Sequence, residues 1–179
     1  QGHVYYPLGE DAAGSTDWDR RGIGVWSAVK DTSRVENLGR DYLGVKTALI
    51  SDLDTYITSG HYENYKKHMF FVASKEDEKQ FALKPMNCPG HMLLFGSDLR
   101  SYRDLPLRYA ESSTLHRHEL AGPLHSLLRV RHVPQADAHI FRRLVQLAED
   151  VVSDLGCAHS LSDLFGLSAR CQQWDWSRR

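Results

Sequence analysis

Cys88 and His139 are residues of the types that bind a transition metal. Cys88 directly precedes Pro89 at the expected start of a helix, where unpaired backbone amides and the helix dipole favour a thiolate. His139 lies in an expected strand and can offer a neutral imidazole, so the two side chains together can bind one zinc ion. No close zinc-binding spacing joins them, and an unrelated cysteine and histidine are the alternative.

Charged side chains alternate at Arg117, Glu119, Arg129 and Arg131. Alternate residues of a strand share one face, so a hairpin of two such strands would present a single charged surface. Guanidinium groups suit phosphate and a carboxylate suits an exocyclic amine, which together indicate a nucleotide site. A solvated sheet face with salt bridges is the alternative.

Three further polar residues are candidates for contact with a substrate. His61 follows a Ser-Gly pair in an expected turn, where a histidine can act as a general base. Gln135 and Asp137 are two residues apart on one expected strand, so they face the same side as His139 and can bind the amine and hydroxyl of a small ligand. A surface histidine and ordinary sheet polarity explain these residues equally well.

The elements that position these residues favour a mixed α+β fold with an antiparallel sheet flanked by helices. The runs 70–74 and 80–85 are expected to pair as strands, and a helix is expected from Pro89 onward. A second helix is expected from 142 to 155, with Gly156 as its stop. Little structure is expected in 1–42. Further strands are expected over 45–53, 101–120, 127–133 and 136–141.

Composition restricts the class of protein. The 22 Lys and Arg against 23 Asp and Glu give a net charge of −1, so there is no overall positive field and any RNA contact would be local. No apolar run is long enough for a membrane span, and three cysteines at unrelated spacings argue against a secreted disulfide framework. A cytoplasmic location is therefore expected, with an organelle as the alternative. The chain begins at Gln1 rather than Met, which suggests a fragment.

Several of these residues stand within longer strings, in the order TSGHYENYKKHMF, FALKPMNCPGH, SYRDLPLRYAE, LHRHEL, LLRVRH and QADAHIF. In this order they resemble the class II threonyl-tRNA synthetases, nearly without a break from about 47 to 141. The resemblance implies an incomplete class II synthetase-like antiparallel sheet. It makes 43–156 a partial catalytic core, with 1–42 a poorly matched N-terminal segment and 157–179 an unplaced C-terminal stretch.

The resemblance implies ATP-dependent activation of threonine and its transfer to tRNA(Thr), with Mg²⁺ accompanying ATP. Cys88 and His139 correspond to two of the family's three protein ligands of Zn²⁺, which binds the amino group and hydroxyl of threonine. Arg117 corresponds to the arginine that holds the α-phosphate of ATP. Glu119 corresponds to the carboxylate that reads adenine, and Arg129 to the next arginine on the ATP side.

The resemblance also implies roles in binding and transferring threonine. Gln135 and Asp137 fall where the family contacts threonine, together with Met86 of the MNCPGH string. His61 matches the histidine implicated in transfer of threonine to the terminal ribose, and Tyr65 lies near it in sequence.

The sequence departs from the family at a few points. Thr47-Ala48 stands where the family has a Thr-Pro at its dimer interface, which leaves homodimer formation open. Ala136 replaces a carboxylate and His118 an asparagine. The family's third zinc ligand and its motif 3, whose arginine holds the γ-phosphate, lie beyond the reach of this sequence, so the chain alone is expected to be inactive or weak.

Two other readings stay open at this point. A degenerate module that binds a nucleotide or an amino acid without catalysis is the main alternative to a ligase. A synthetase for proline or serine is weaker, because a zinc-binding Cys88 has no purpose for those amino acids.

Overall fold

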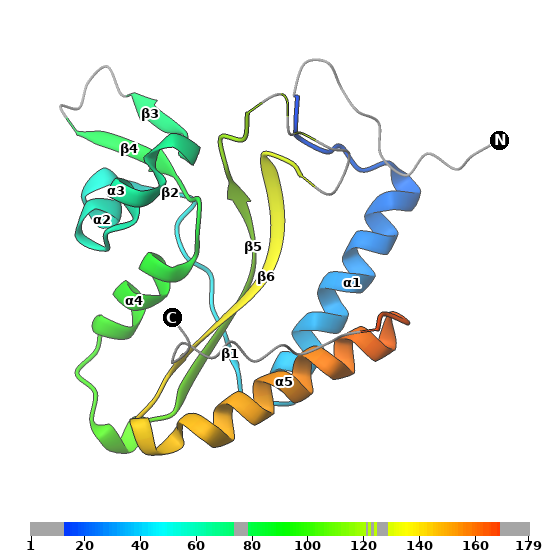
Figure 1. Ribbon diagram of the computed structural model, residues 1–179, viewed down its shortest axis with the longest axis vertical. Helices are drawn as coiled ribbons and strands as arrows, with labels where there is room; N and C mark the ends of the chain where they lie inside the picture. The colour runs from blue at the N-terminus through cyan, green and yellow to red at the C-terminus, as the bar shows by residue number, and fades with distance from the viewer. Residues whose placement is uncertain (1–12, 74–78, 121, 123, 125–128, 169–179) are drawn as a thin grey trace, which may run out of the picture. The chain divides into compact units, whose positions relative to one another are not determined.

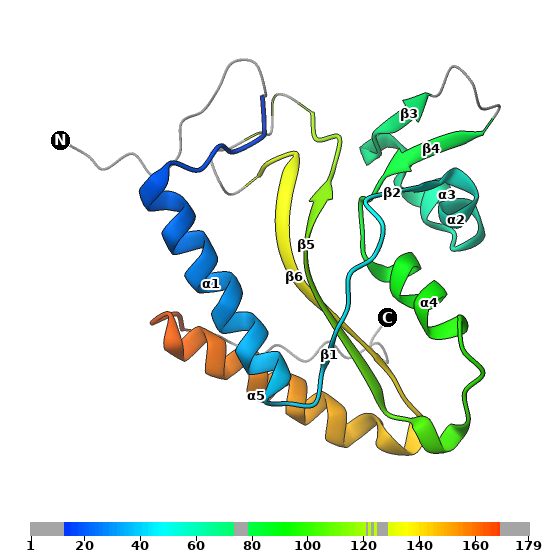
Figure 2. The ribbon, with the colours of Figure 1, turned by 180° about the vertical axis from the view of Figure 1, so that it is seen from behind.

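Two ten-residue strands, β5 (Leu107–His116) and β6 (His132–Phe141), form an antiparallel pair that runs in continuous register from Leu107 opposite Phe141 to His116 opposite His132. Strand β1 (Leu43–Gly44) pairs parallel with β5, which gives the order β1-β5-β6 (Figures 1 and 2). The computed structural model describes residues 13–73, 79–120, 122, 124 and 129–168. Contacts divide the chain into two units, 1–141 and 142–179.

A second sheet of short strands has the order β2-β4-β3, and both of its pairs are antiparallel. Its members are β2 (Ile50–Asp52), β3 (Phe71–Ala73) and β4 (Gln80–Leu83). The pairing of β3 with β4 confirms the strand pair predicted from the runs 70–74 and 80–85.

Short helices connect β2 to β3 where the sequence suggested a turn. They are α2 (Leu53–Thr58), α3 (His61–Tyr65) and the 3₁₀ helix η2 (Lys66–His68). Leu53, Tyr56 and Met69 pack with Ala82 of β4 in a small buried cluster. Gly60 links α2 to α3 with a φ of 73°, a left-handed conformation that glycine adopts without a steric cost. This turn sets the position of His61.

Helix α4 (Cys88–Gly96) begins where the sequence predicted, with Asn87 as its N-cap and Pro89 in its first turn. Its glycines differ in their surroundings. A Cβ built on Gly90 would lie 2.8 Å from Cβ and 2.9 Å from Cγ2 of Thr47, whereas a Cβ on Gly96 would meet nothing within 4 Å. Gly90 therefore allows the helix to approach the segment that carries Thr47.

Replacing Gly90 with alanine is expected to lower the free energy of unfolding by about 1–3 kcal/mol, because the added methyl overlaps Thr47. The matched change Gly96→Ala in the same helix is expected to be neutral or slightly stabilising, since alanine is the better helix former. Urea unfolding of both variants measures the difference. Equal stability of the two variants would contradict the close packing of α4 on Thr47.

Three expectations about local structure were wrong. Residues 1–42 include a 19-residue helix, α1 (Arg20–Leu38), whose N-cap Asp19 accepts hydrogen bonds from the backbone amides of Arg21 (2.9 Å) and Gly22 (2.6 Å). The predicted strand over 45–53 is reduced to β2. The two strands predicted over 127–133 and 136–141 are a single strand, β6, which includes Pro134 and begins at His132; residues 127 and 128 lie outside the described part.

The second unit contains the 3₁₀ helix η4 (Leu144–Gln146) and helix α5 (Leu147–Leu164). A helix was predicted over 142–155, but α5 starts later and continues through Gly156 for two more turns. One glycine costs a helix only about 1 kcal/mol, so it need not end the helix. Within this unit Arg142 lies 3.7 Å from the buried carboxylate of Asp150.

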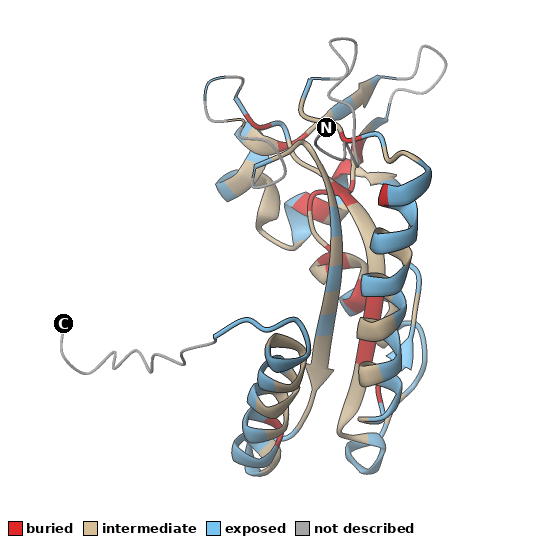
Figure 3. Ribbon diagram, turned by 90° about the vertical axis from the view of Figure 1, so that its right-hand side faces the viewer, coloured by how far each residue is buried: buried red, intermediate tan, exposed pale blue. Residues whose placement is uncertain are grey.

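The α+β class and the antiparallel pairing predicted from the sequence are confirmed. Figure 3 shows that buried residues gather along β5 and near the start of α4, whereas α1 is mostly exposed or half-buried. Among the helices of the described residues, none is both long and apolar enough to cross a membrane.

Candidate functional site

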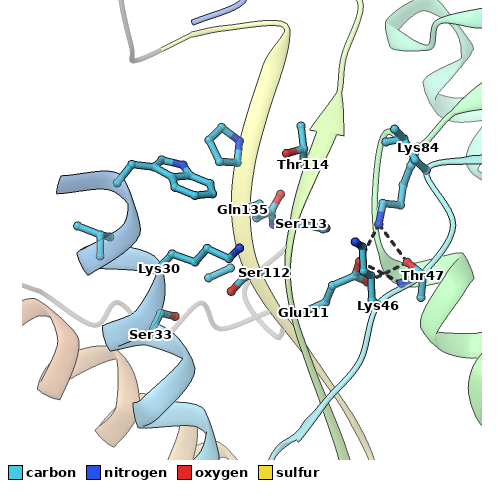
Figure 4. Close-up of a pocket in the computed structure, with 15 residues that line it drawn as sticks. Lys30, Ser33, Lys46, Thr47, Lys84, Glu111, Ser112, Ser113, Thr114 and Gln135 are labelled. Atoms are coloured by element: carbon cyan, nitrogen blue, oxygen red, sulfur yellow. Dashed lines mark hydrogen bonds and ion pairs between the residues drawn. The ribbon is translucent and has the colours of Figure 1, made fainter. Parts of the chain in front are cut away.

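A buried carboxylate, Glu111 of β5, accepts hydrogen bonds from three neighbouring residues. Lys84 Nζ lies 2.8 Å from Oε1, and His91 Nε2 lies 3.0 Å from Oε2. The Thr47 amide donates to Oε1 at 3.1 Å and its hydroxyl to Oε2 at 2.8 Å (Figure 4). Glu111 is 2% exposed, Lys84 3% and His91 0%. We call these four residues the Glu111 network.

The contacts in the Glu111 network favour the ionised carboxylate. Burial alone would raise the pKa of Glu111, but the hydrogen bonds from His91, Lys84 and Thr47 outweigh it and lower the pKa from 4.5 to about 2. The ion pair with Lys84 holds together segments 27 residues apart in sequence. Glu111 therefore fixes the start of α4 and the Thr47 segment against the sheet.

Acid is expected to destabilise the protein through Glu111. The depressed pKa contributes stability that is fully present above pH 4.5 and is lost as pH falls from 4.5 towards 2. The loss amounts to about 3 kcal/mol for a shift of this size. We expect the free-energy difference between the unmodified chain and Glu111→Gln to narrow by that amount between pH 5 and pH 2, as measured by urea unfolding. Parallel pH profiles would contradict the lowered pKa.

Through His91, the Glu111 network contacts His139, one of the two predicted metal ligands. The Nδ1 atoms of His91 and His139 lie 2.9 Å apart, and the two rings are nearly perpendicular at 83°. Burial, with a smaller effect of His91, lowers the pKa of His139 below its ordinary value, although Asp137 opposes the shift. A neutral imidazole, the form that binds metals, is thus favoured at His139.

The second predicted ligand, Cys88, lies at the start of α4 next to Asn87. Asn87 donates to Asp137 Oδ2 (3.1 Å) and accepts from the Ser113 hydroxyl (2.8 Å), which joins the helix start to both long strands. Burial, followed by the nearby Asp137, raises the pKa of Cys88, whereas its backbone amide and Arg117 lower it less. Burial and Asp137 thus oppose the thiolate that the helix start was expected to favour.

Cys88 and His139 fit zinc by donor type, and both lie close enough to Asp137 for its charge to shift their pKa values. Among the described residues, no group of three or more His, Cys, Asp and Glu side chains could hold a metal ion. A third protein donor is thus not supplied by this part of the chain. The shared zinc site stays a prediction.

Arg117 lies just past the end of β5 and is held in place by two groups. Its Nε donates to the Pro85 carbonyl at 3.2 Å, and its guanidinium lies over the Tyr65 ring at 5.9 Å from the centroid. These contacts bring together Arg117, Tyr65 and the segment that contains the half-buried Met86. They leave the other guanidinium nitrogens of Arg117 without a carboxylate partner among the described contacts, which suits phosphate binding.

Glu119 and Arg129 form an ion pair, with Arg129 Nη2 at 2.8 Å and Nε at 3.1 Å from Glu119 Oε2. Glu119 is buried, whereas half of the Arg129 side chain is exposed. Arg131 donates to the Glu119 backbone carbonyl at 2.9 Å. The sequence placed these residues on two paired strands, whereas β5 ends at His116 and β6 begins at His132. The backbone pairing nevertheless continues past the strand ends, because the Arg117 amide donates to the Arg131 carbonyl at 2.9 Å.

The remaining candidates are placed on two separate elements. His61 begins α3, and its Nδ1 lies 2.9 Å from the Ser59 hydroxyl. Gln135 and Asp137 lie on the same face of β6, opposite Ser113 and Glu111 of β5. No described contact joins His61 to Gln135 or to Cys88, and their grouping around one site stays a prediction.

A cavity of about 430 Å³ lies between α1 and the sheet. Figure 4 shows the residues that line it. It is lined by Trp26, Lys30 and Ser33 of α1, and by Ser112, Thr114 and Gln135 of β5 and β6 among others. Three members of the Glu111 network, Thr47, Lys84 and Glu111, form part of its wall. Gln135 is the only one of the predicted site residues in its lining.

The residues that the sequence did not reveal are Thr47, Lys84, Asn87, His91 and Glu111. Each supports a predicted residue or the element that carries it. His91 lies three residues after Cys88, the spacing at which side chains share a helix face, and this was the one local signal that linked it to the site. The contacts of Lys84 and Glu111 join distant segments and leave no local pattern.

The sequence of this chain is similar to those of known proteins. Residues 70–167 match the family model described as the tRNA synthetase class II core domain (G, H, P, S and T). The threonine–tRNA ligase of Maridesulfovibrio salexigens is 44% identical over 158 residues, which cover 88% of this chain and 24% of that protein. That of Ralstonia nicotianae is 42% identical over 161 residues, covering 90% and 25%. The chain spans about a quarter of the length of these relatives.

Solved structures are similar as well. A structure described as the RNA binding domain of threonyl-tRNA synthetase from Cryptosporidium parvum Iowa II has a TM-score of 0.86 and 38% identity, covering 90% of this chain and 40% of its own. Giardia lamblia prolyl-tRNA synthetase in complex with prolyl-adenylate has a TM-score of 0.77 over 89% of this chain and 32% of its own. At 23% identity the latter shows the fold alone. The class II synthetase-like sheet predicted from the sequence is thereby confirmed.

Proposed function

Because the chain belongs to the tRNA synthetase class II core-domain family, we propose that it is part of a threonine–tRNA ligase, which activates threonine with ATP and transfers it to tRNA(Thr). The observation that carries the proposal is the hydrogen bond from Asn87 to Asp137. It joins the helix start that bears Cys88 to the strand that bears Asp137 and His139. Residues suited to binding an amino acid thus meet at one point of the sheet.

Arg117, Glu119 and Arg129 form the ATP side of the proposed site. The guanidinium of Arg117 is held by Pro85 and Tyr65 and binds the α-phosphate. Glu119 accepts a hydrogen bond from the exocyclic amine of adenine, and Arg129 fixes the orientation of that carboxylate through the 2.8 Å contact. Mg²⁺ accompanies the triphosphate and balances its charge.

Threonine binds on the face of β6 that carries Gln135 and Asp137, with Met86 beside them. Asp137 receives the amino group, because its carboxylate lies close enough to both Cys88 and His139 to shift their pKa values. A zinc ion bound by Cys88, His139 and a third donor would supply a Lewis acid that recognises both the amine and the hydroxyl of threonine. Valine, which lacks the hydroxyl, would then be rejected.

His61 and Tyr65 belong to the transfer step. Both lie on α3, and Ser59 holds the His61 ring through its Nδ1. With Nδ1 engaged, Nε2 is the nitrogen available to take a proton from the ribose hydroxyl of the tRNA end.

The proposal is tested by amino-acid-dependent exchange of pyrophosphate into ATP. The assay uses the protein in which this sequence occurs and compares threonine, serine, proline and valine. Exchange that requires threonine supports the proposal. Exchange with proline or serine would overturn the choice of amino acid. Binding of ATP without exchange by any amino acid would favour a non-catalytic nucleotide-binding module.

A further inference from the structure

Three groups form an uninterrupted line from β5 to β6 through α4. Glu111 Oε2 lies 3.0 Å from His91 Nε2, and His91 Nδ1 lies 2.9 Å from His139 Nδ1. His91 is fully buried, so no water competes for either of its nitrogens. Each of the two contacts needs one proton between its atoms, and this requirement determines where the protons lie.

The proton between Glu111 and His91 belongs to His91. Glu111 is ionised and can only accept, because Lys84 Nζ and the Thr47 groups also donate to its oxygens. His91 therefore carries hydrogen on Nε2. A second hydrogen on the His91 ring would add a positive charge in a fully buried position near Lys84, so the contact with His139 is assigned with Nδ1 of His91 as the acceptor.

The proton between the two histidines must then come from His139. Since His91 Nδ1 is an acceptor, His139 carries its hydrogen on Nδ1, and its Nε2 holds a lone pair. Asp137 makes no described hydrogen bond to His139: its Oδ2 accepts from Asn87 at 3.1 Å and its Oδ1 from the amide of Ala138 at 2.9 Å.

We propose that Glu111 and His91 are positioning residues that lock His139 in the tautomer with hydrogen on Nδ1, so that Nε2 is permanently presented as a donor atom. Ligating histidines commonly owe their tautomer to such a partner on the other nitrogen. Nε2 is the atom that a divalent cation of the zinc class would meet. The use of this donor atom depends on the proposed function, whereas the tautomer itself does not.

The first test is the tautomer of His139 in the unmodified 179-residue chain. Histidine is labelled with ¹⁵N, and two-bond ¹H–¹⁵N spectra are recorded at about pH 8, where a free imidazole with pKa near 6.5 is neutral. His139→Gln and His91→Phe assign the signals. We expect a protonated Nδ1 and an unprotonated Nε2 for His139. A protonated Nε2 on His139 would overturn the proposal.

The second test uses Glu111→Gln to reverse the direction of the two hydrogen bonds that join residue 111 to His91 and His91 to His139. Lys84 and the Thr47 amide both donate to Oε1, so the amide oxygen of the glutamine takes that position. Its NH₂ then faces His91 and the Thr47 hydroxyl, which has to turn and accept where it now donates. His91 is then expected to carry hydrogen on Nδ1, and His139 to move its proton to Nε2. An unchanged His139 tautomer in the folded variant would overturn the role of Glu111.

His91→Phe provides the same test if Glu111→Gln does not fold. Phenylalanine fills the space of the ring but accepts no hydrogen bond, so His139 is expected to lose its exclusive Nδ1–H form. A merely structural role of His91 would leave that form unchanged. Absence of threonine-dependent exchange together with the expected tautomers would remove the proposed function and leave the positioning pair intact.

Discussion

Replacing Lys84 with methionine is expected to lower the free energy of unfolding by about 3–5 kcal/mol at pH 7. Methionine keeps the length and apolar body of the side chain but removes the ammonium that lies 2.8 Å from Glu111 Oε1. Both side chains are almost fully buried, at 4% and 1% exposure, so the carboxylate would remain in the interior without its cation. Breaking one partner of a buried pair costs more than the pair contributes, because the remaining charge is uncompensated.

Lys79→Met is the matched control. Lys79 lies 3.1 Å from Asp52, but its side chain is 72% exposed, and water and salt screen such a pair. We expect a loss below about 1 kcal/mol there. Urea unfolding followed by circular dichroism compares the two variants. The double variant Lys84→Met with Glu111→Gln is expected to be less destabilised than the two losses summed, and additive losses would show that the two residues are not coupled.

The hairpin and α4 could be predicted because their signals are local. Alternating or continuous apolar residues over 70–74 and 80–85 and the Asn-Cys-Pro start of α4 depend only on neighbours in sequence. Helix α1 was missed for the opposite reason. Its large apolar residues, such as Ile23, Val25, Val29, Val35 and Leu38, are exposed and are not gathered on one buried face, so the clearest local signal is the cap at Asp19.

The residue types of the candidate site could be predicted from the sequence, but the residues that hold them in place could not. Arg117, Glu119 and Arg129 were identified by charge, but they lie beyond the ends of β5 and β6, where the Arg117 amide still donates to the Arg131 carbonyl. Lys84 and Glu111 are charged residues, which are expected at the surface unless a partner is near. That partner comes from a segment 27 residues away, and no pattern of neighbours indicates it.

Arg117→Ala is expected to reduce threonine-dependent pyrophosphate exchange by the protein that carries this sequence by about 10²–10³-fold. Arg117 is the guanidinium of the proposed ATP side that is not paired with a carboxylate in the described contacts, and it is already held by Pro85 and Tyr65. Its charge is therefore in position before the α-phosphate is attacked, when negative charge develops there. Removing a preorganised donor of this kind affects the transition state more than the bound ATP.

Arg103→Ala is the control for Arg117→Ala, because Arg103 lies in an exposed 3₁₀ helix, η3 (Tyr102–Asp104), away from the proposed ATP side. It removes the same charge, so it corrects for any general effect of net charge on ATP binding. We expect exchange within about twofold of the unmodified protein for this control. For Arg117→Ala the melting temperature is measured alongside, since loss of the bond to the Pro85 carbonyl costs only about 1 kcal/mol. Full exchange activity in a folded Arg117→Ala variant would show that another group holds the α-phosphate.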